Sequence, residues 1–298
     1  MRPAPSSSSP AEFSRGFDTP TDMLDLPGGR VAYYRFGTGP DVVCVHGWPL
    51  HAATFRRLLP ALTRHFTVHL LDLPGTGHTR WKTPAGLGPN LEALRQTVAH
   101  LSLSRYGLLA HDSGGLFARQ LAADNPAVRA LVLAGTEIPD HFAWQLGLYL
   151  AAGKIPGAHH LFGAALQVGP LRRSGIGFGG CFTDPTYADG EFGDLFVRPL
   201  ARPEVMLGQM GLLRNLDPGV LKTLPAVHAR ILCPTLCLWG ERDPFFPVEK
   251  ARAMLPQFAG GARLVSIPQG RLFVHEDHPE VFDAQAVPFL VEHLGPAA

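Results

Sequence analysis

The sequence has almost no net charge, few cysteines and no long hydrophobic run. Its 298 residues include 26 Lys and Arg against 25 Asp and Glu, which gives a formal net charge of +1. A near-neutral chain gives no electrostatic reason to expect nucleic acid or an acidic membrane as a partner. Four cysteines are too few for a disulfide framework. We expect Cys233 and Cys237, which lie in or beside an apolar run, to be buried free thiols.

Several further absences narrow the class of protein. No run of about 18 apolar residues occurs, which argues against a membrane span. Residues 1–20 are rich in Ser and Pro and have no apolar stretch typical of a signal peptide, so we predict a disordered tail and a cytoplasmic protein. The fourteen histidines show no convincing ligand spacing, so we expect no metal and no organic cofactor.

What the sequence does contain is an alternation of strand and helix patterns. Apolar runs lie within 41–49, 66–79, 128–137 and 230–247, and residues 105–126 read as a strand, a sharp turn and a helix. Helical spacing occurs at 52–66 and 90–103, and a helix at 248–258 precedes a last strand within 262–269. This order predicts an α/β fold with a mostly parallel, buried sheet. This alternation of strand and helix patterns is interrupted in the middle of the chain. We therefore predict a core of residues 21–137 and 226–298, with an inserted helical cap at 138–225.

The stretch "LLAHDSGGLFARQLA" at 108–122 predicts a tight turn from strand to helix that exposes one nucleophile. The residues two before and two after that nucleophile must be small, because the strand and helix backbones approach closely there. With Asp112 as nucleophile these flanks are Ala110 and Gly114. With Ser113 one flank would be His111, whose imidazole would clash. The steric argument favours Asp112 as the nucleophile. The alternative is that Asp112 is a buried structural residue with no catalytic role.

Four motifs in order carry a resemblance to a known family: "HGWP" (46–49), "DLPGTGHT" (72–79), "AHDSGG" (110–115) and "WGERDPFFP" (239–247). Over about 22–295 the chain resembles the α/β-hydrolase fold, and within it the epoxide hydrolases and haloalkane dehalogenases that use an aspartate nucleophile. The resemblance implies an alkyl-enzyme ester that water then hydrolyses. The charge that develops on the ester oxygen is stabilised in this family by two backbone N–H groups, which map to Trp48 and Ser113. Trp48 can also line the pocket with its side chain.

The same resemblance assigns Asp243 as the carboxylate that orients a histidine, with a solvated turn aspartate as the alternative. Glu137 is a second candidate for that acid and is otherwise expected at the hinge of the cap. The histidine itself is missing. In "SIPQGRLFVHEDHPEVF" (266–282), counting from Pro268 and from Pro279 places Leu272 at the family's histidine.

His275 is the nearest replacement for the base, because positions three apart share a face of a helix. We therefore expect His275 to reach Asp243. The alternatives are His278, a base from elsewhere, or no base at all. General-base help is worth about 10²–10⁴-fold, so without it the ester would form and persist, or ligand would bind without turnover.

The substrate expected from the resemblance is a small apolar molecule, with an epoxide favoured over a haloalkane. Dehalogenases usually carry Trp directly after the nucleophile, where this chain has Ser113. Epoxide hydrolases use cap tyrosines, for which Tyr149 and Tyr187 are the candidates, although for either one a core or surface residue is the favoured interpretation. The cap aromatics Trp144, Phe162, Phe178 and Phe182 suggest an apolar ligand. Two alternatives stay open: a serine esterase using Ser113, and a ligand-binding protein of reduced activity. A homodimer is also among our expectations.

Overall fold

The computed structural model describes residues 10–295, and within them the strands form one nine-stranded sheet. The spatial order is β1-β2-β4-β3-β6-β7-β8-β9, and β5 pairs with β2. The strands from β4 and β3 through to β9 run parallel, and β1, β2 and β5 are antiparallel. The strands are β1 (Asp22–Leu26), β2 (Gly29–Phe36), β3 (Asp41–Val45), β4 (Thr67–Leu71), β5 (Arg80–Trp81), β6 (Tyr106–His111), β7 (Val128–Ala134), β8 (Thr235–Gly240) and β9 (Ala262–Ile267).

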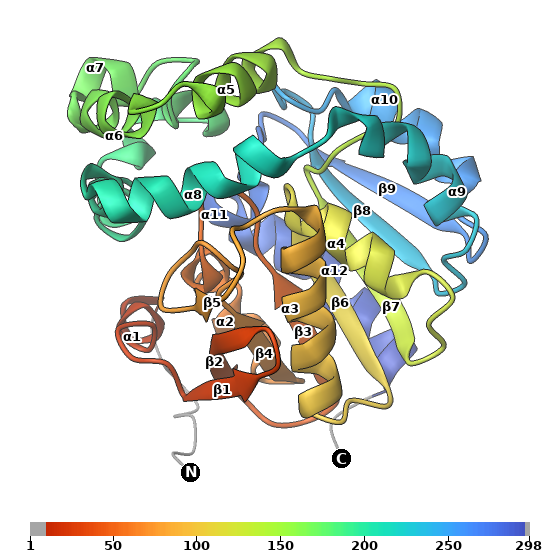
Figure 1. Ribbon diagram of the computed structural model, residues 1–298. Helices are drawn as coiled ribbons and strands as arrows, with labels where there is room; N and C mark the ends of the chain where they lie inside the picture. Colours follow the sequence, from red (N-terminus) through yellow and green to blue (C-terminus); the bar gives the residue numbers. More distant parts are fainter. Residues whose placement is uncertain (1–9, 296–298) are drawn as a thin grey trace.

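Helices cover both faces of this sheet. In Figure 1, α3 and α4 lie in front of the strands and α12 lies behind them. The helices are α1 (Pro10–Arg15), α2 (Leu59–Leu62), α3 (Leu87–His100), α4 (Gly114–Ala122), α5 (Trp144–Lys154), α6 (Ala158–Gln167), α7 (Gly169–Arg172), α8 (Pro203–Asn215), α9 (Leu224–His228), α10 (Val248–Met254), α11 (Val274–Asp277) and α12 (Pro279–Leu294). The predicted fold class, a mostly parallel sheet flanked by helices, is confirmed.

The central strands are apolar on both sides because helices cover both faces. Every residue of β4, β6 and β8 is buried. The cysteines are buried and free, as predicted for Cys233 and Cys237. No helix among residues 10–295 combines the length and the apolar character needed to cross a bilayer.

The segment between β7 and β8 contains α5 to α8, within the range where the sequence predicts a cap. Figure 1 shows α5, α6 and α7 as an outer layer, with α8 between them and the sheet. The 3-10 turn Gly179–Cys181 also belongs to this segment, and its Cys181 carbonyl accepts a hydrogen bond of 3.1 Å from the Phe273 N–H. The cap is thereby tied to the loop that follows β9.

Two local predictions are wrong. The disordered tail was predicted to extend to residue 20, but α1 begins at Pro10, and Phe13 and Phe17 are buried against the aromatic side chains of β2. Two apolar anchors are enough to order this otherwise polar stretch; residues 1–9 lie outside the described part. The single helix predicted over 52–66 is instead a 3-10 turn followed by α2, because Pro60 has no N–H and starts a new helix.

Candidate active site

A sharp turn joins β6 to α4 and carries Asp112. The backbone of Asp112 has a φ of 51°, in the left-handed region that non-glycine residues rarely adopt. Gly114 makes the turn possible: a Cβ there would lie 2.2 Å from the Val45 carbonyl oxygen. The close approach that the sequence analysis inferred at Gly114 is therefore present. Ser113, in contrast, has ordinary helical dihedral angles at the start of α4.

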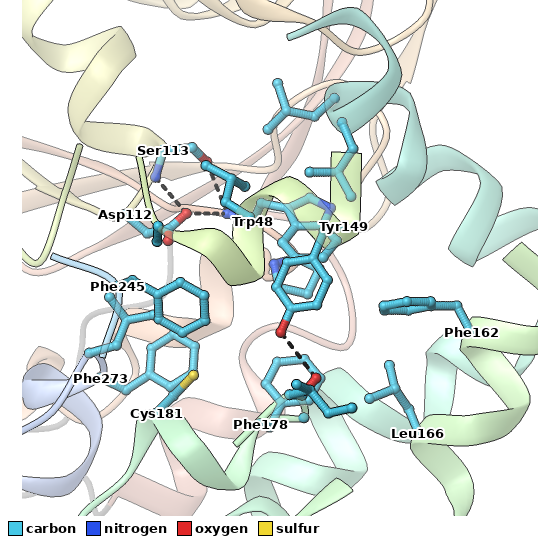
Figure 2. Close-up of a pocket in the computed structure, with 18 of the residues that line it drawn as sticks. Trp48, Asp112, Ser113, Tyr149, Phe162, Leu166, Phe178, Cys181, Phe245 and Phe273 are labelled. Atoms are coloured by element: carbon cyan, nitrogen blue, oxygen red, sulfur yellow. Dashed lines mark hydrogen bonds between the residues drawn. The ribbon is translucent and has the colours of Figure 1, made fainter. Parts of the chain in front are cut away.

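Two backbone N–H groups converge on one oxygen of the Asp112 carboxylate. Trp48 N–H donates to Oδ1 at 3.0 Å and Ser113 N–H donates to the same atom at 2.5 Å (Figure 2). Trp48 N–H also contacts Ser113 Oγ at 3.0 Å. A Cβ on Gly47 would lie 2.3 Å from the Asp112 Cβ, so this contact requires glycine. The geometry is that of two donors able to stabilise negative charge on an oxygen attached to Asp112 Cγ.

The ionisation of Asp112 is finely balanced. Burial and the negative charge of Glu137 raise the pKa of Asp112 to about 7, although the two N–H donors act in the opposite direction and lower it. A nucleophilic carboxylate is available, and its fraction depends on pH.

Asp112 faces an apolar cavity of about 80 Å³ beneath the cap. Most of its wall is aliphatic or aromatic: Trp48, Leu146, Phe162, Leu166, Phe178, Leu200, Met206, Leu212, Leu213, Leu216, Phe245, Phe246, Leu272 and Phe273 contribute. The ionisable residues lining it are Asp112, Glu137, Tyr149 and Cys181. Within residues 10–295, no histidine lines this cavity. The cavity suits a small apolar ligand with one reactive polar group.

Asp243 lies just beyond β8 and is buried. Its Oδ1 accepts hydrogen bonds from the Phe245 and Phe246 N–H groups at 2.8 and 2.9 Å. Its Oδ2 has no hydrogen-bond partner among the described residues. Burial raises the pKa of Asp243 to about 7. One carboxylate oxygen is thus fixed by the turn, and the other is an acceptor without a donor.

Leu272 occupies the space next to that free oxygen. A Cβ on Gly135 would lie 3.1 Å from both Asp243 Oδ2 and Leu272 Cδ1, so the two groups border the same small volume. Leu272 also lines the cavity together with Asp112. An aliphatic side chain, which can neither donate nor accept a proton, therefore borders Asp243 Oδ2 and lines the same cavity as Asp112.

The structure does not bring His275 to Asp243, and our expectation of a hydrogen bond between them is wrong. His275 is fully buried, its Nε2 hydrogen-bonds Thr54 Oγ1 at 2.8 Å, and its ring packs at a tilt against the His111 ring with centroids 4.3 Å apart. The reason is local. The helix α11 starts only at Val274, so the three-residue helical offset from Leu272 does not apply. His275 belongs to the core behind the cavity.

Glu137 follows β7 and lines the cavity with Asp112. Its Oε2 accepts a hydrogen bond from Thr136 Oγ1 at 2.8 Å and lies 3.8 Å from Arg119 Nη2. Burial raises its pKa. From the sequence, Glu137 is the second candidate, after Asp243, for the acid. Its position makes it a second ionisable carboxyl group on the wall of the same cavity.

The two candidate tyrosines lie in different places. Tyr149 lines the cavity, and its hydroxyl donates to the Ile176 carbonyl at 3.0 Å (Figure 2). Tyr187 does not line it; its hydroxyl donates to the Glu276 carbonyl at 3.0 Å and its ring packs on Phe182. The expectation that Tyr187 contacts ligand is therefore wrong, because the loop carrying it folds against α11. Cys181 was not predicted as a lining residue, since the glycine-rich stretch around it gave no periodic signal.

The indole of Trp48 is already hydrogen-bonded. Its Nε1–H donates to the Gln209 carbonyl on α8 at 2.9 Å. Its ring lies 5.6 Å from the Tyr149 ring, centroid to centroid. Trp48 thus places its backbone N–H at Asp112 while its side chain contacts the cap, so both roles expected for it are compatible in one conformation.

Comparison with known proteins assigns the family. A model described as the alpha/beta hydrolase fold matches residues 40–162. A pimeloyl-[acyl-carrier protein] methyl ester esterase of Chromobacterium violaceum is 31% identical over 270 residues, which cover 87% of this chain and 95% of that protein. The chain belongs to the α/β-hydrolase fold family. Among other α/β hydrolases, a soluble epoxide hydrolase of a Corynebacterium species is 37% identical over 102 residues, 34% of this chain and 35% of that protein.

A solved epoxide hydrolase structure has a TM-score of 0.77 at 20% identity and covers 91% of this chain and 98% of its own. At that identity the likeness concerns the α/β-hydrolase fold alone. The similar α/β hydrolases include both esterases and epoxide hydrolases. Membership of the family supports an enzyme of hydrolase type, and the reaction has to be argued from the residues of the site.

Proposed function

We propose that this α/β hydrolase opens a C–O bond in a small apolar epoxide by attack of the Asp112 carboxylate, and that it hydrolyses the resulting ester slowly. One observation carries the proposal: Asp112 stands on the strained turn after β6, faces an apolar cavity, and has two N–H donors on one oxygen. A carboxylate in this setting is a nucleophile for saturated carbon.

In the first step, the Asp112 carboxylate attacks a ring carbon of the epoxide. The bond from that carbon to the epoxide oxygen breaks, and the oxygen leaves as an alkoxide that takes up a proton. The Tyr149 hydroxyl lines the cavity and can donate this proton. The product of this step is a hydroxyalkyl ester of Asp112.

In the second step, water adds to the ester carbonyl carbon of Asp112. The negative charge that develops on the carbonyl oxygen is stabilised by the Trp48 and Ser113 N–H groups. Breakdown of this intermediate restores the carboxylate and releases a diol: one proton of the water goes to the departing alkoxide oxygen, and the other returns through solvent to the group that protonated the epoxide oxygen. The water needs a base, and the side chain beside Asp243 and the cavity is that of Leu272. We therefore propose that the ester forms readily and is hydrolysed about 10²–10⁴-fold more slowly than with an imidazole in place.

The choice of an epoxide over a haloalkane follows from the hydrogen-bond donors. A departing halide needs N–H donors inside the cavity, but the Trp48 indole N–H is bound to the Gln209 carbonyl. The residue after Asp112 is serine, which has no side-chain N–H. An epoxide oxygen instead needs a proton, and the Tyr149 hydroxyl can supply one.

Intact-protein mass spectrometry after exposure to short-chain epoxides tests the proposal. The expected result is a stoichiometric adduct of the full mass of the epoxide, mapped by peptide analysis to Asp112 and decaying slowly. Asp112→Asn removes the nucleophile while keeping the shape and should abolish the adduct. Ser113→Ala is the matched control and should retain it. An adduct that forms equally well with Asp112→Asn would refute the assignment.

A serine esterase using Ser113 is the second candidate, because the Chromobacterium relative is a methyl ester esterase and Ser113 also lines the cavity. Its Oγ contacts the Trp48 N–H at 3.0 Å, and among residues 10–295 no imidazole contacts it. Labelling by a fluorophosphonate probe that is lost in Ser113→Ala and kept in Asp112→Asn would establish this candidate and displace the first.

A further inference from the structure

The cavity beneath the cap is lined by acidic groups and, within residues 10–295, by no basic one. Asp112 and Glu137 are the carboxyl groups on its wall, and no Lys, Arg or His of the described chain joins them there. The other ionisable groups, Tyr149 and Cys181, stay uncharged at neutral pH, because burial raises the pKa of both. A cation inside the cavity would therefore be attracted, and an anion would meet no counter-charge on the wall.

Glu137 presents an oxygen that no other residue satisfies. Its side chain is only 5% exposed, and its Oε2 accepts the hydrogen bond from Thr136. Its Oε1 accepts no hydrogen bond from another residue in the described part of the chain. Because Glu137 belongs to the cavity wall, a donor inside the cavity is the group that can reach Oε1. A buried acceptor without a donor lowers stability, and an N–H group of a ligand would restore that loss.

The charge next to Glu137 is only partly compensated. Arg119 lies behind the wall, 3.8 Å from Oε2, and offsets this one carboxylate. Asp112 forms no ion pair among residues 10–295, since its partners are two backbone N–H groups that carry no net charge. Both of those donors contact Oδ1. The three groups together therefore keep one negative charge when both carboxyl groups are ionised.

The opposite side of the wall, around Cys181, is also acidic. The charges that act on its thiol are three carboxylates and one guanidinium: Asp112, Asp243, Asp277 and Arg271. His278 lies 3.7 Å from Asp277 and offsets it only when protonated. One carboxylate is left in excess even in that case. No part of the wall thus compensates the negative charge of Asp112.

The remainder of the wall offers aromatic faces. The ring of Tyr149 is the centre of a cluster, with centroids 5.6 Å from Trp48, 5.8 Å from Phe162 and 6.4 Å from Phe245. Figure 2 shows aromatic rings of the core and of the cap around the space that Asp112 faces. The face of an aromatic ring carries partial negative charge and attracts cations, more strongly where water is absent. An organic cation suits this wall better than a metal ion, which needs several oxygen ligands.

We propose that the cavity selects an apolar molecule carrying one positively charged nitrogen, and that Glu137 Oε1 holds this ammonium group. The inference rests on the proposed function only where it places the epoxide of such a molecule at Asp112; binding of the cation does not depend on that chemistry. The carboxylates are already desolvated in the folded protein. A cation that enters therefore adds only its own desolvation and gains the pairing, whereas a neutral ligand leaves Oε1 without a donor.

Three small probes of similar length test the charge preference on the unmodified full chain: butylammonium, 1-butanol and butanoate. At about pH 7.5 the amine is a cation and the acid an anion, because their pKa values lie near those of lysine, about 10.4, and glutamate, about 4.3. Dissociation constants come from NMR chemical-shift titrations. Butylammonium should bind about tenfold or more tightly than 1-butanol, the factor expected for a hydrogen bond to a charged partner. Butanoate should bind most weakly.

Glu137→Gln removes the charge and keeps the shape of the side chain. It should weaken butylammonium binding about tenfold and leave 1-butanol binding unchanged. Glu204→Gln is the matched control, because Glu204 is exposed on α8 and does not line the cavity, and it should change neither affinity. Circular dichroism checks that Glu137→Gln is folded, since the change takes a partner from buried Arg119. If it is not, the three probes on the unmodified chain decide.

The proposal is overturned if the unmodified chain binds the three probes equally or binds butanoate best. Butylammonium binding that survives in folded Glu137→Gln overturns it as well. Cation selectivity without any adduct on Asp112 after exposure to epoxides would keep this inference and remove the proposed function. An adduct on Asp112 without cation selectivity would do the reverse.

Discussion

Replacing Leu272 with histidine should convert a slow ester hydrolase into a faster one. The side chain of Leu272 borders the same small volume as the free Oδ2 of Asp243 and lines the cavity with Asp112. An imidazole at this position can donate one ring N–H to Oδ2 and direct its other nitrogen to a water near the Asp112 ester. The acceptor is already present: Asp243 Oδ2 is buried and has no partner within residues 10–295.

The magnitude follows from two parts. General-base assistance is worth about 10²–10⁴-fold in the hydrolytic step. The new hydrogen bond also compensates a desolvated carboxyl, whose pKa is raised by burial to about 7 from 3.8. Pairing should therefore lower the pKa of Asp243. We expect the decay of a preformed adduct on Asp112 to accelerate about 100-fold or more in Leu272→His.

The assay loads the protein with an epoxide, removes the excess and follows the adduct by intact mass over time. Leu272→Phe is the control for shape, since a phenyl ring cannot accept a proton, and its adduct should decay at the parent rate. Adding Asp243→Asn to Leu272→His should remove most of the gain. If Leu272→His folds, forms the adduct and loses it no faster than Leu272→Phe, the placement of the missing base at residue 272 is refuted.

The other predictions concern ionisation and packing. The rate of adduct formation should rise with pH through a midpoint near 7, because burial and the charge of Glu137 raise the pKa of Asp112 to about 7. Glu137→Gln should move that midpoint to lower pH. Intact-mass measurement of the adduct at fixed times, from about pH 5.5 to 8.5, gives the midpoint of the parent and of the variant. The raised pKa of Asp243 means that the folded state keeps its proton longer than the unfolded state, so its contribution to stability is lost as pH rises through about 7. The stability of Asp243→Asn relative to the parent should therefore rise between about pH 4 and pH 7, by up to about 4 kcal/mol in urea unfolding, and level off above that range; a pH-independent difference would contradict this. Phe17→Ala should lower the unfolding free energy by about 3 kcal/mol, because Phe17 is buried against Tyr34, and an unchanged urea midpoint would show that the segment does not contribute.

The features that the sequence predicted well are those set by local chemistry. The apolar runs of the central strands cannot face water, so they predicted the buried parallel sheet. The crowding at Gly114 predicted the turn that presents Asp112, because only a small residue fits against the Val45 carbonyl. Both inferences depend on a few neighbouring residues and needed no knowledge of distant contacts.

What could not be predicted depends on where a chain segment goes in three dimensions. His275 was placed by assuming a helix from Leu272, but that stretch becomes helical only at Val274 and turns the imidazole toward Thr54. Tyr187 and Cys181 lie on either side of a loop without periodicity, and tertiary packing alone decides that Cys181 faces the cavity. The order of α1 likewise depends on Phe13 and Phe17 finding β2.

The bond from the Trp48 indole to the Gln209 carbonyl links α8 to the residue whose backbone N–H contacts Asp112. Because the donor side chain and the N–H that contacts Asp112 belong to one residue, any shift of α8 that admits a bulkier ligand pulls on the donor as well. The acceptor is a main-chain oxygen, so changing the side chain at 209 leaves this coupling intact. Engineers who graft a different lid onto this scaffold would need to preserve the height of that helix above the sheet, whatever residues it carries.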